Sequence, residues 1–110
     1  MRQLKGHLSL DLETTTNTHM KRRGSPWHPD GYVVLAGWAA NDGPPQSSHY
    51  RSQAEWRSST LLKDLLEEHN PAFIFGLNLK FDILWLLVNQ PENYAAWQEW
   101  VVAGGMVIDA

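Results

Sequence analysis

Asp11 and Glu13 are the first residues of this chain whose types and spacing point to chemistry. They belong to His7–Glu13, a segment in which apolar and polar residues alternate with the period of a strand. Side chains at positions i and i+2 of a strand lie on one face, so both carboxylates are expected to point the same way. A divalent cation relieves the repulsion between two such charges, and Mg²⁺ and Mn²⁺ prefer hard oxygen ligands. The pair is therefore a candidate metal site; the alternative is an exposed strand face that carries two solvated acids.

A third carboxylate, Asp82, lies where a short apolar run passes into a helix. The run is Ala72–Gly76, and the predicted helix is Leu79–Asn89. Asp82 falls in the first helical turn, where the helix dipole favours a negative charge, and this stabilising role is the alternative to a functional one. If the run is a strand parallel and adjacent to the first, the two carboxyl ends lie side by side, where open α/β sheets place their ligands. Asp82 would then face the carboxylate pair across the end of the sheet.

The N-terminal half of the chain predicts strands and one long loop. Tyr32–Ala40 is a largely apolar run that predicts a second strand, and Asn41–Pro45 predicts a turn. Ser48–Arg51 is expected to form a short third strand, which makes a hairpin with the second. Between the first two strands lies Thr14–Gly31, which has no apolar periodicity and predicts a long loop.

The C-terminal half predicts helices alternating with strands. A leucine stripe within Leu61–Leu66 indicates a helix that ends at Asn70-Pro71, and Tyr94–Val102 predicts a further helix. Met106–Ala110 predicts the last strand. Strands joined through helices are expected to be parallel and the leading hairpin antiparallel, so residues 1–110 predict one mixed-sheet α/β domain. This architecture is similar to the ribonuclease H-like fold, in which three antiparallel strands precede βαβ units with flanking helices.

Composition excludes several classes of protein. The chain has 110 residues, a formal net charge of −3 and no cysteine, so a polybasic binder, a disulfide framework and a cysteine nucleophile are excluded. No apolar run approaches the roughly 20 residues of a membrane span, and no signal peptide is recognised, so we expect no membrane contact and a cytoplasmic location. Most of the six tryptophans are expected to pack in the core.

Two motifs carry a resemblance to a family. Leu8–Thr15, with the order D-x-E-T at Asp11, resembles the first motif of the DEDD 3′–5′ exonucleases. Gly76–Asp82 resembles their second motif in the form found in the proofreading domains of family A DNA polymerases, and Val107–Ala110 is similar to the strand that follows. Gly24–Asp30 resembles the first-motif loop of some bacteriophage polymerases.

The resemblance implies a metal-dependent 3′–5′ exonuclease that hydrolyses phosphodiester bonds at single-stranded DNA 3′ ends. Asp11, Glu13 and Asp82 would hold two divalent cations, Mg²⁺ or Mn²⁺, with Asp11 bridging both. Four residues would lie near the terminal nucleotide: Leu12, Thr14, Asn78 and Phe81. Three basic residues are possible phosphate contacts, with a solvated loop tip as the alternative: Lys21, Arg22 and Arg23.

One departure from the family pattern affects the expected activity. The third motif, a Tyr or His followed four residues later by an Asp, lies beyond the strand that begins at Met106 and is absent. Asp109 is not its equivalent, because it lies on that strand. The chain therefore resembles an N-terminal fragment of an exonuclease domain, truncated at the C-terminus and inactive or weak alone, with a polymerase domain as a possible C-terminal partner. The alternative is a degenerate exonuclease fold that binds a nucleic acid or a protein partner without catalysis.

Overall fold

Strand β1 (His7–Thr14) forms the centre of a five-stranded sheet in the computed structural model, which describes residues 3–17, 22–23, 26–27 and 31–110. The strand order is β5-β4-β1-β6-β7. On one side of β1 lie the antiparallel strands β4 (Val33–Ala40) and β5 (Gln46–His49). On the other side lie the parallel strands β6 (Phe73–Gly76) and β7 (Met106–Asp109). The expected mixed sheet, an antiparallel part followed by parallel strands, is confirmed.

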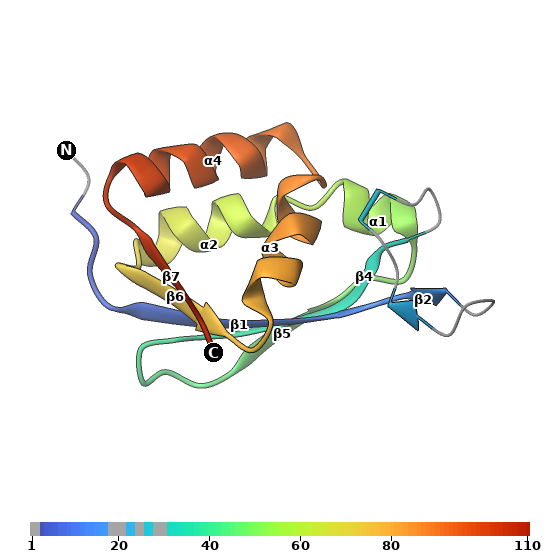
Figure 1. Cartoon of the computed structure of the whole chain (residues 1–110), viewed down its shortest axis with the longest axis horizontal. Helices are drawn as coiled ribbons and strands as arrows, with labels where there is room; N and C mark the ends of the chain where they lie inside the picture. The colour runs from blue at the N-terminus through green and yellow to red at the C-terminus, as the bar shows by residue number, and fades with distance from the viewer. Residues whose placement is uncertain (1–2, 18–21, 24–25, 28–30) are drawn as a thin grey trace.

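Four helices connect the later strands. They are α1 (Gln53–Arg57), α2 (Leu61–His69), α3 (Leu79–Leu87) and α4 (Pro91–Val102). Figure 1 shows α2, α3 and α4 on one side of the sheet. The core lies between these helices and the sheet, and its largest side chains include Trp85 and Trp100, which are almost fully buried. Within the described chain, no helix is both long enough and apolar enough to cross a lipid bilayer.

Three expectations about the elements need correction. The third strand, β5, begins at Gln46, earlier than predicted. Its sequence is polar, so its bounds are set by pairing with β4 and not by a hydrophobic pattern. Helix α1 was not predicted; Ser52 accepts a hydrogen bond from the Glu55 amide and caps it. The loop expected over Thr14–Gly31 contains a short antiparallel pair, β2 (Thr16–Asn17) and β3 (Arg22–Arg23).

The two faces of the sheet differ in their side chains. Leu8, Leu10 and Leu12 of β1 are buried beneath the helices. The intervening residues of β1 lie on the opposite face of the sheet. The residues of β4 and β6 that pair with them lie on that face as well. This open face carries small residues on β4 and apolar residues on β6 and β7: Gly37, Ala39, Phe73, Phe75, Met106 and Ile108.

Candidate metal and nucleic-acid site

Strand β1 extends beyond the end of its parallel neighbour. The pairing of β1 with β6 covers only His7, Leu8 and Ser9, and β6 ends at Gly76, whereas β1 continues to Thr14. Gly76 lies so close to β1 that a Cβ atom there would be 2.4 Å from the Leu10 carbonyl oxygen. The second half of β1 therefore has β4 along one edge and no β6 residue along the other.

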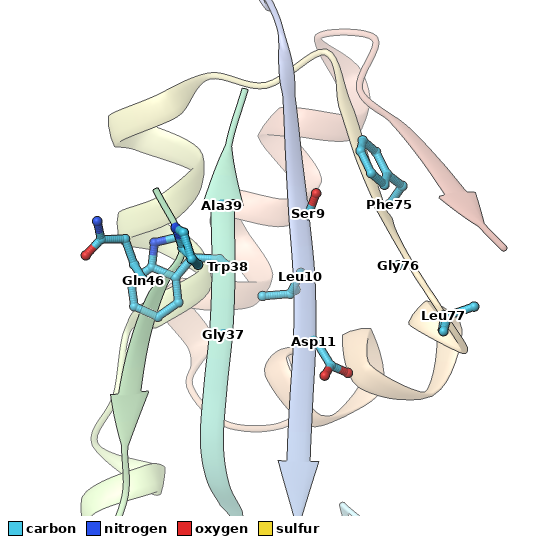
Figure 2. A pocket seen from close by; sticks show the side chains of 11 residues that line it. Ser9, Leu10, Asp11, Gly37, Trp38, Ala39, Gln46, Phe75, Gly76 and Leu77 are labelled. Atoms are coloured by element: carbon cyan, nitrogen blue, oxygen red, sulfur yellow. The ribbon is translucent and has the colours of Figure 1, made fainter. Parts of the chain in front are cut away.

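Asp11 and Glu13 lie on this extension and share the open face, as the alternating pattern predicts. Both are exposed, whereas Leu10 and Leu12 beside them are buried. Asp11 pairs with Gly37 of β4, and Figure 2 shows its carboxylate projecting from β1 on the side where β6 ends. Two carboxylates are thus accessible from solvent at the end of a strand. Carboxylate oxygens are the hard donors that Mg²⁺ and Mn²⁺ prefer.

Asp82 reaches the same part of β1 from the helical layer. It lies in the first turn of α3, is 1% exposed, and its Oδ2 accepts a hydrogen bond from the Leu12 amide at 3.3 Å. Because the Leu10 carbonyl points toward β6, the Leu12 amide points to that side too. Asp82 therefore supplies the acceptor that a further residue of β6 would have supplied to the ladder.

The first and second motifs are joined by a hydrogen bond to the backbone of β1. Asp82 contacts the amide of Leu12, the residue between the two candidate ligands. Within the described ranges, no three histidine, aspartate or glutamate side chains form a cluster able to hold a metal ion. Asp11 and Glu13 share one face of β1. Asp82 contacts β1 at the edge of the strand, through the Leu12 amide.

The four residues expected near the terminal nucleotide are placed differently from one another. Leu12 has its side chain in the core, so only its backbone is available at this edge, and Thr14 is half-buried beside a register shift in β1. Asn78 is exposed, with a left-handed backbone at φ 54°. Phe81 is half-buried and packs edge-on against Trp85, so this contact supports a role in the hydrophobic core.

The basic run lies at the margin of the described chain. Lys21 lies outside the described residues. Arg22 and Arg23 form β3, whose backbone pairs with Asn17 and Thr16. Gly24, Ser25 and His28–Asp30 of the segment similar to a bacteriophage polymerase loop also lie outside the described residues, so their expected role stays a prediction.

A shallow cavity of about 470 Å³ opens on the uncovered face beside Asp11. Ser9 and Ala39 contribute small side chains to it, Gly37 contributes backbone alone, and Phe75 and Leu77 flank it (Figure 2). Of the residues that the structure describes, Asp11 is the one charged side chain that lines it. Its size falls in the range of ligand sites, and its small, mostly apolar lining can accept a flat group next to the carboxylate pair.

Asp109 has a structural role that the sequence analysis missed. Its Oδ1 accepts the Leu79 amide at 2.9 Å, and its Oδ2 accepts the Lys80 amide at 3.0 Å. These bonds to the backbone of Lys80 and Leu79, together with the Lys80 charge, hold the pKa of Asp109 below its usual value of 3.8. The signal in the sequence is weak, because the carboxylate caps a helix that begins thirty residues earlier.

Comparison of the chain with protein-family models, curated proteins and solved structures finds no match.

Proposed function

We propose that this chain is a metal-dependent 3′–5′ exonuclease domain of ribonuclease H-like architecture. The observation that carries the proposal is the placement of the two motifs. The carboxylates of D-x-E stand on the open face of the central strand, past the end of β6, and the Asp of the second motif bonds to the residue between them. The strand order, with an antiparallel half and a parallel half about β1, supports the same assignment.

The carboxylates here are of the donor type that divalent cations take, although among the described residues no three of them form a cluster that could hold a metal ion. Asp11 and Glu13 offer carboxylate oxygens to solvent at one strand end, and Asp82 brings a third carboxyl group to the same backbone segment. When bound, two such cations supply an activated water for attack on the terminal phosphodiester and charge stabilisation for the leaving 3′ oxygen. In this proposal Asp11 and Glu13 would hold the ion on the side of the attacking water, and Asp11 and Asp82 would hold the other ion.

Single-stranded DNA is the substrate that this surface favours. The cavity beside Asp11 is open along the sheet and lined by small and apolar side chains, which suits an unpaired base better than a duplex backbone. Among the described residues, no lysine or arginine lines the cavity. We propose that the metal ions provide positive charge for the phosphate.

The test is release of 5′-mononucleotides from the 3′ end of a labelled single-stranded oligonucleotide in Mg²⁺ or Mn²⁺. The 110-residue chain is compared with the same chain extended at Ala110 by the third-motif segment of a DEDD exonuclease. We expect little release from the chain itself, and release from the extended chain that Asp11→Ala abolishes. The exposed helical acid Glu92, changed to Gln, is the control. Metal-dependent release that survives Asp11→Ala, or digestion from the 5′ end, contradicts the proposal.

A second candidate function, a partner-binding module without catalysis, is favoured by the outer strand. Every residue of β7 is exposed, including Met106, Val107 and Ile108, which are 57%, 40% and 48% exposed. An apolar edge strand exposed on both faces is a surface that another polypeptide can cover. An extended chain that binds no Mn²⁺ and cleaves no DNA, yet binds a protein through β7, would favour this candidate.

A further inference from the structure

The N-terminus of helix α3 is capped by a residue of strand β7, which lies about thirty residues later in the chain. Its own N-cap residue, Asn78, has a left-handed backbone and makes no capping hydrogen bond through its side chain. The first amide groups of a helix need acceptors. Asp109 of β7 supplies them, with its two carboxylate oxygens 2.9 Å from the Leu79 amide and 3.0 Å from the Lys80 amide.

The end of β7 is itself fixed to the strand that leads into α3. Asp109 pairs with Gly76 of β6, and the Ala110 amide donates to the Gly76 carbonyl at 3.0 Å. Gly76 in turn lies against the Leu10 carbonyl of β1. The carboxylate that caps α3 is therefore held in a frame made by three adjacent strands.

Asp82 lies in the helical turn that Asp109 caps. Only Phe81 separates Asp82 from Lys80, whose amide bonds to Asp109, and Asp82 Oδ2 bonds to the Leu12 amide. A helical turn is stiff, so the position of Leu79 and Lys80 sets where the Asp82 carboxyl group lies. Asp109 and Asp82 thus fasten the first turn of α3 to β7 and to β1 respectively.

We propose that Asp109 is a positioning residue that holds Asp82 against β1 between the two candidate ligands. We assign its carboxylate to α3, because both oxygens accept amide groups of the first helical turn. The positioning itself follows from the contacts; its importance for metal binding rests on the proposed function.

Amide hydrogen exchange measured by NMR tests the positioning. The readout is the exchange rate of the Leu12 amide, which bonds to Asp82, divided by that of the Ile74 amide in the centre of the sheet. This ratio removes the effect of global destabilisation. In Asp109→Ala we expect the ratio to rise about tenfold, the consequence of weakening one hydrogen bond of ordinary net strength. Asp109→Asn retains one oxygen acceptor and is expected to restore part of the protection.

Ser52→Ala is the matched control, because Ser52 caps a different helix, α1, through the Glu55 amide. It is expected to leave the ratio of Leu12 to Ile74 exchange unchanged. If Asp109→Ala does not fold, Asp109→Asn decides the question. A ratio that stays at the wild-type value in folded Asp109 variants overturns the proposal. Failure of the wild-type chain to bind Mn²⁺ would instead remove the proposed function and leave the exchange result standing.

Discussion

Asp82 shows how a single side chain can serve both the fold and a candidate site. Its carboxyl group is buried, and it accepts the amide of Leu12 at the point where the strand ladder loses β6. The same placement is compatible with a metal ligand, because Leu12 lies between Asp11 and Glu13. Variants that keep the shape of Asp82 are therefore needed to separate its structural role from the proposed metal-binding role.

Asp82→Ala is expected to lower the free energy of unfolding by about 1–3 kcal/mol, because a buried strand amide loses its acceptor. Asp82→Asn should cost less, since its amide oxygen can still accept that bond. Urea denaturation measures both changes. Asp42→Ala, at an exposed turn position, is the control. Equal losses for Asp82→Ala and Asp42→Ala would contradict the role assigned to Asp82.

Acid should weaken the cap that Asp109 provides. Its folded-state pKa lies below 3.8, so the ionised carboxylate favours the folded chain. That contribution is fully present above pH 3.8 and is lost as the pH falls from there through the folded-state pKa. We expect Asp109→Asn to be less stable than the wild type at pH 7, with the difference in urea midpoint shrinking below pH 3.8. A difference that is constant down to the lowest pH at which both fold would contradict this assignment.

Among the elements, the junction of β1 with β6 determines where the candidate site lies. Gly76 ends β6 with its α-carbon against the Leu10 carbonyl, a main-chain atom that cannot move aside as a side chain can. The short length of β6 leaves Asp11 and Glu13 beyond the parallel pairing. A change at Gly76 should therefore disturb the site and the sheet together.

Gly76→Ala is expected to lower the free energy of unfolding by about 1–3 kcal/mol, the usual cost of overpacking. Gly37→Ala is the control, because a Cβ atom there meets its nearest neighbours at an ordinary 3.8 Å. Thermal unfolding followed by circular dichroism compares the two. If Gly37→Ala proves as damaging as Gly76→Ala, the close approach of β6 to β1 is not as described.

The sequence predicted the elements that have a strong apolar pattern. The alternation in β1 and the leucines of α2 gave the correct strand and helix, and both lie within one or two residues of the observed bounds. Helix α1 was missed because it buries a single residue, Trp56, although Ser52 and Glu55 form the start of a capping pattern. The polar strand β5 has no pattern of its own, so its position depends on pairing with β4.

For the candidate site, the sequence placed Asp11 and Glu13 on one face of a strand and Asp82 in the first turn of a helix after a parallel strand, but it could not predict the bond from the Leu12 amide to Asp82. Its contact with Leu12 depends on where β6 ends, which is a property of the sheet and not of the local sequence. The cap by Asp109 was unpredictable for the same reason, because it needs β7 beside β6.

The exposed apolar strand β7 predicts self-association at high concentration. Met106 and Ile108 share the open face with Phe73 and Phe75, and β7 has an unpaired edge in the described chain. Ile108→Lys should reduce light scattering at high protein concentration with little change in stability, because its side chain is half exposed. Tyr94→Lys is the control, since Tyr94 is equally exposed on α4, away from that face. Equal effects of the two variants would contradict association through β7.

For the molecule as a whole, charge determines how the proposed substrate could approach. The chain has 12 acidic and 9 basic residues and a formal net charge of −3, so it repels a nucleic acid at long range. Two divalent cations would reverse the sign of this charge and place the positive charge beside Asp11. We therefore infer that substrate binding requires metal binding.

Titration of the 110-residue chain with Mn²⁺, followed by NMR line broadening, tests the proposed metal binding most directly. We expect weak binding, with broadening centred on residues 9–14 and 78–84. This broadening is expected to be lost in Asp11→Asn combined with Glu13→Gln. Asp64→Asn combined with Glu68→Gln, which removes two exposed acids of α2, is the control and should leave the broadening in place. Broadening that spares residues 9–14 and 78–84, or that persists at the same Mn²⁺ concentration in the Asp11 and Glu13 variant, would contradict the account.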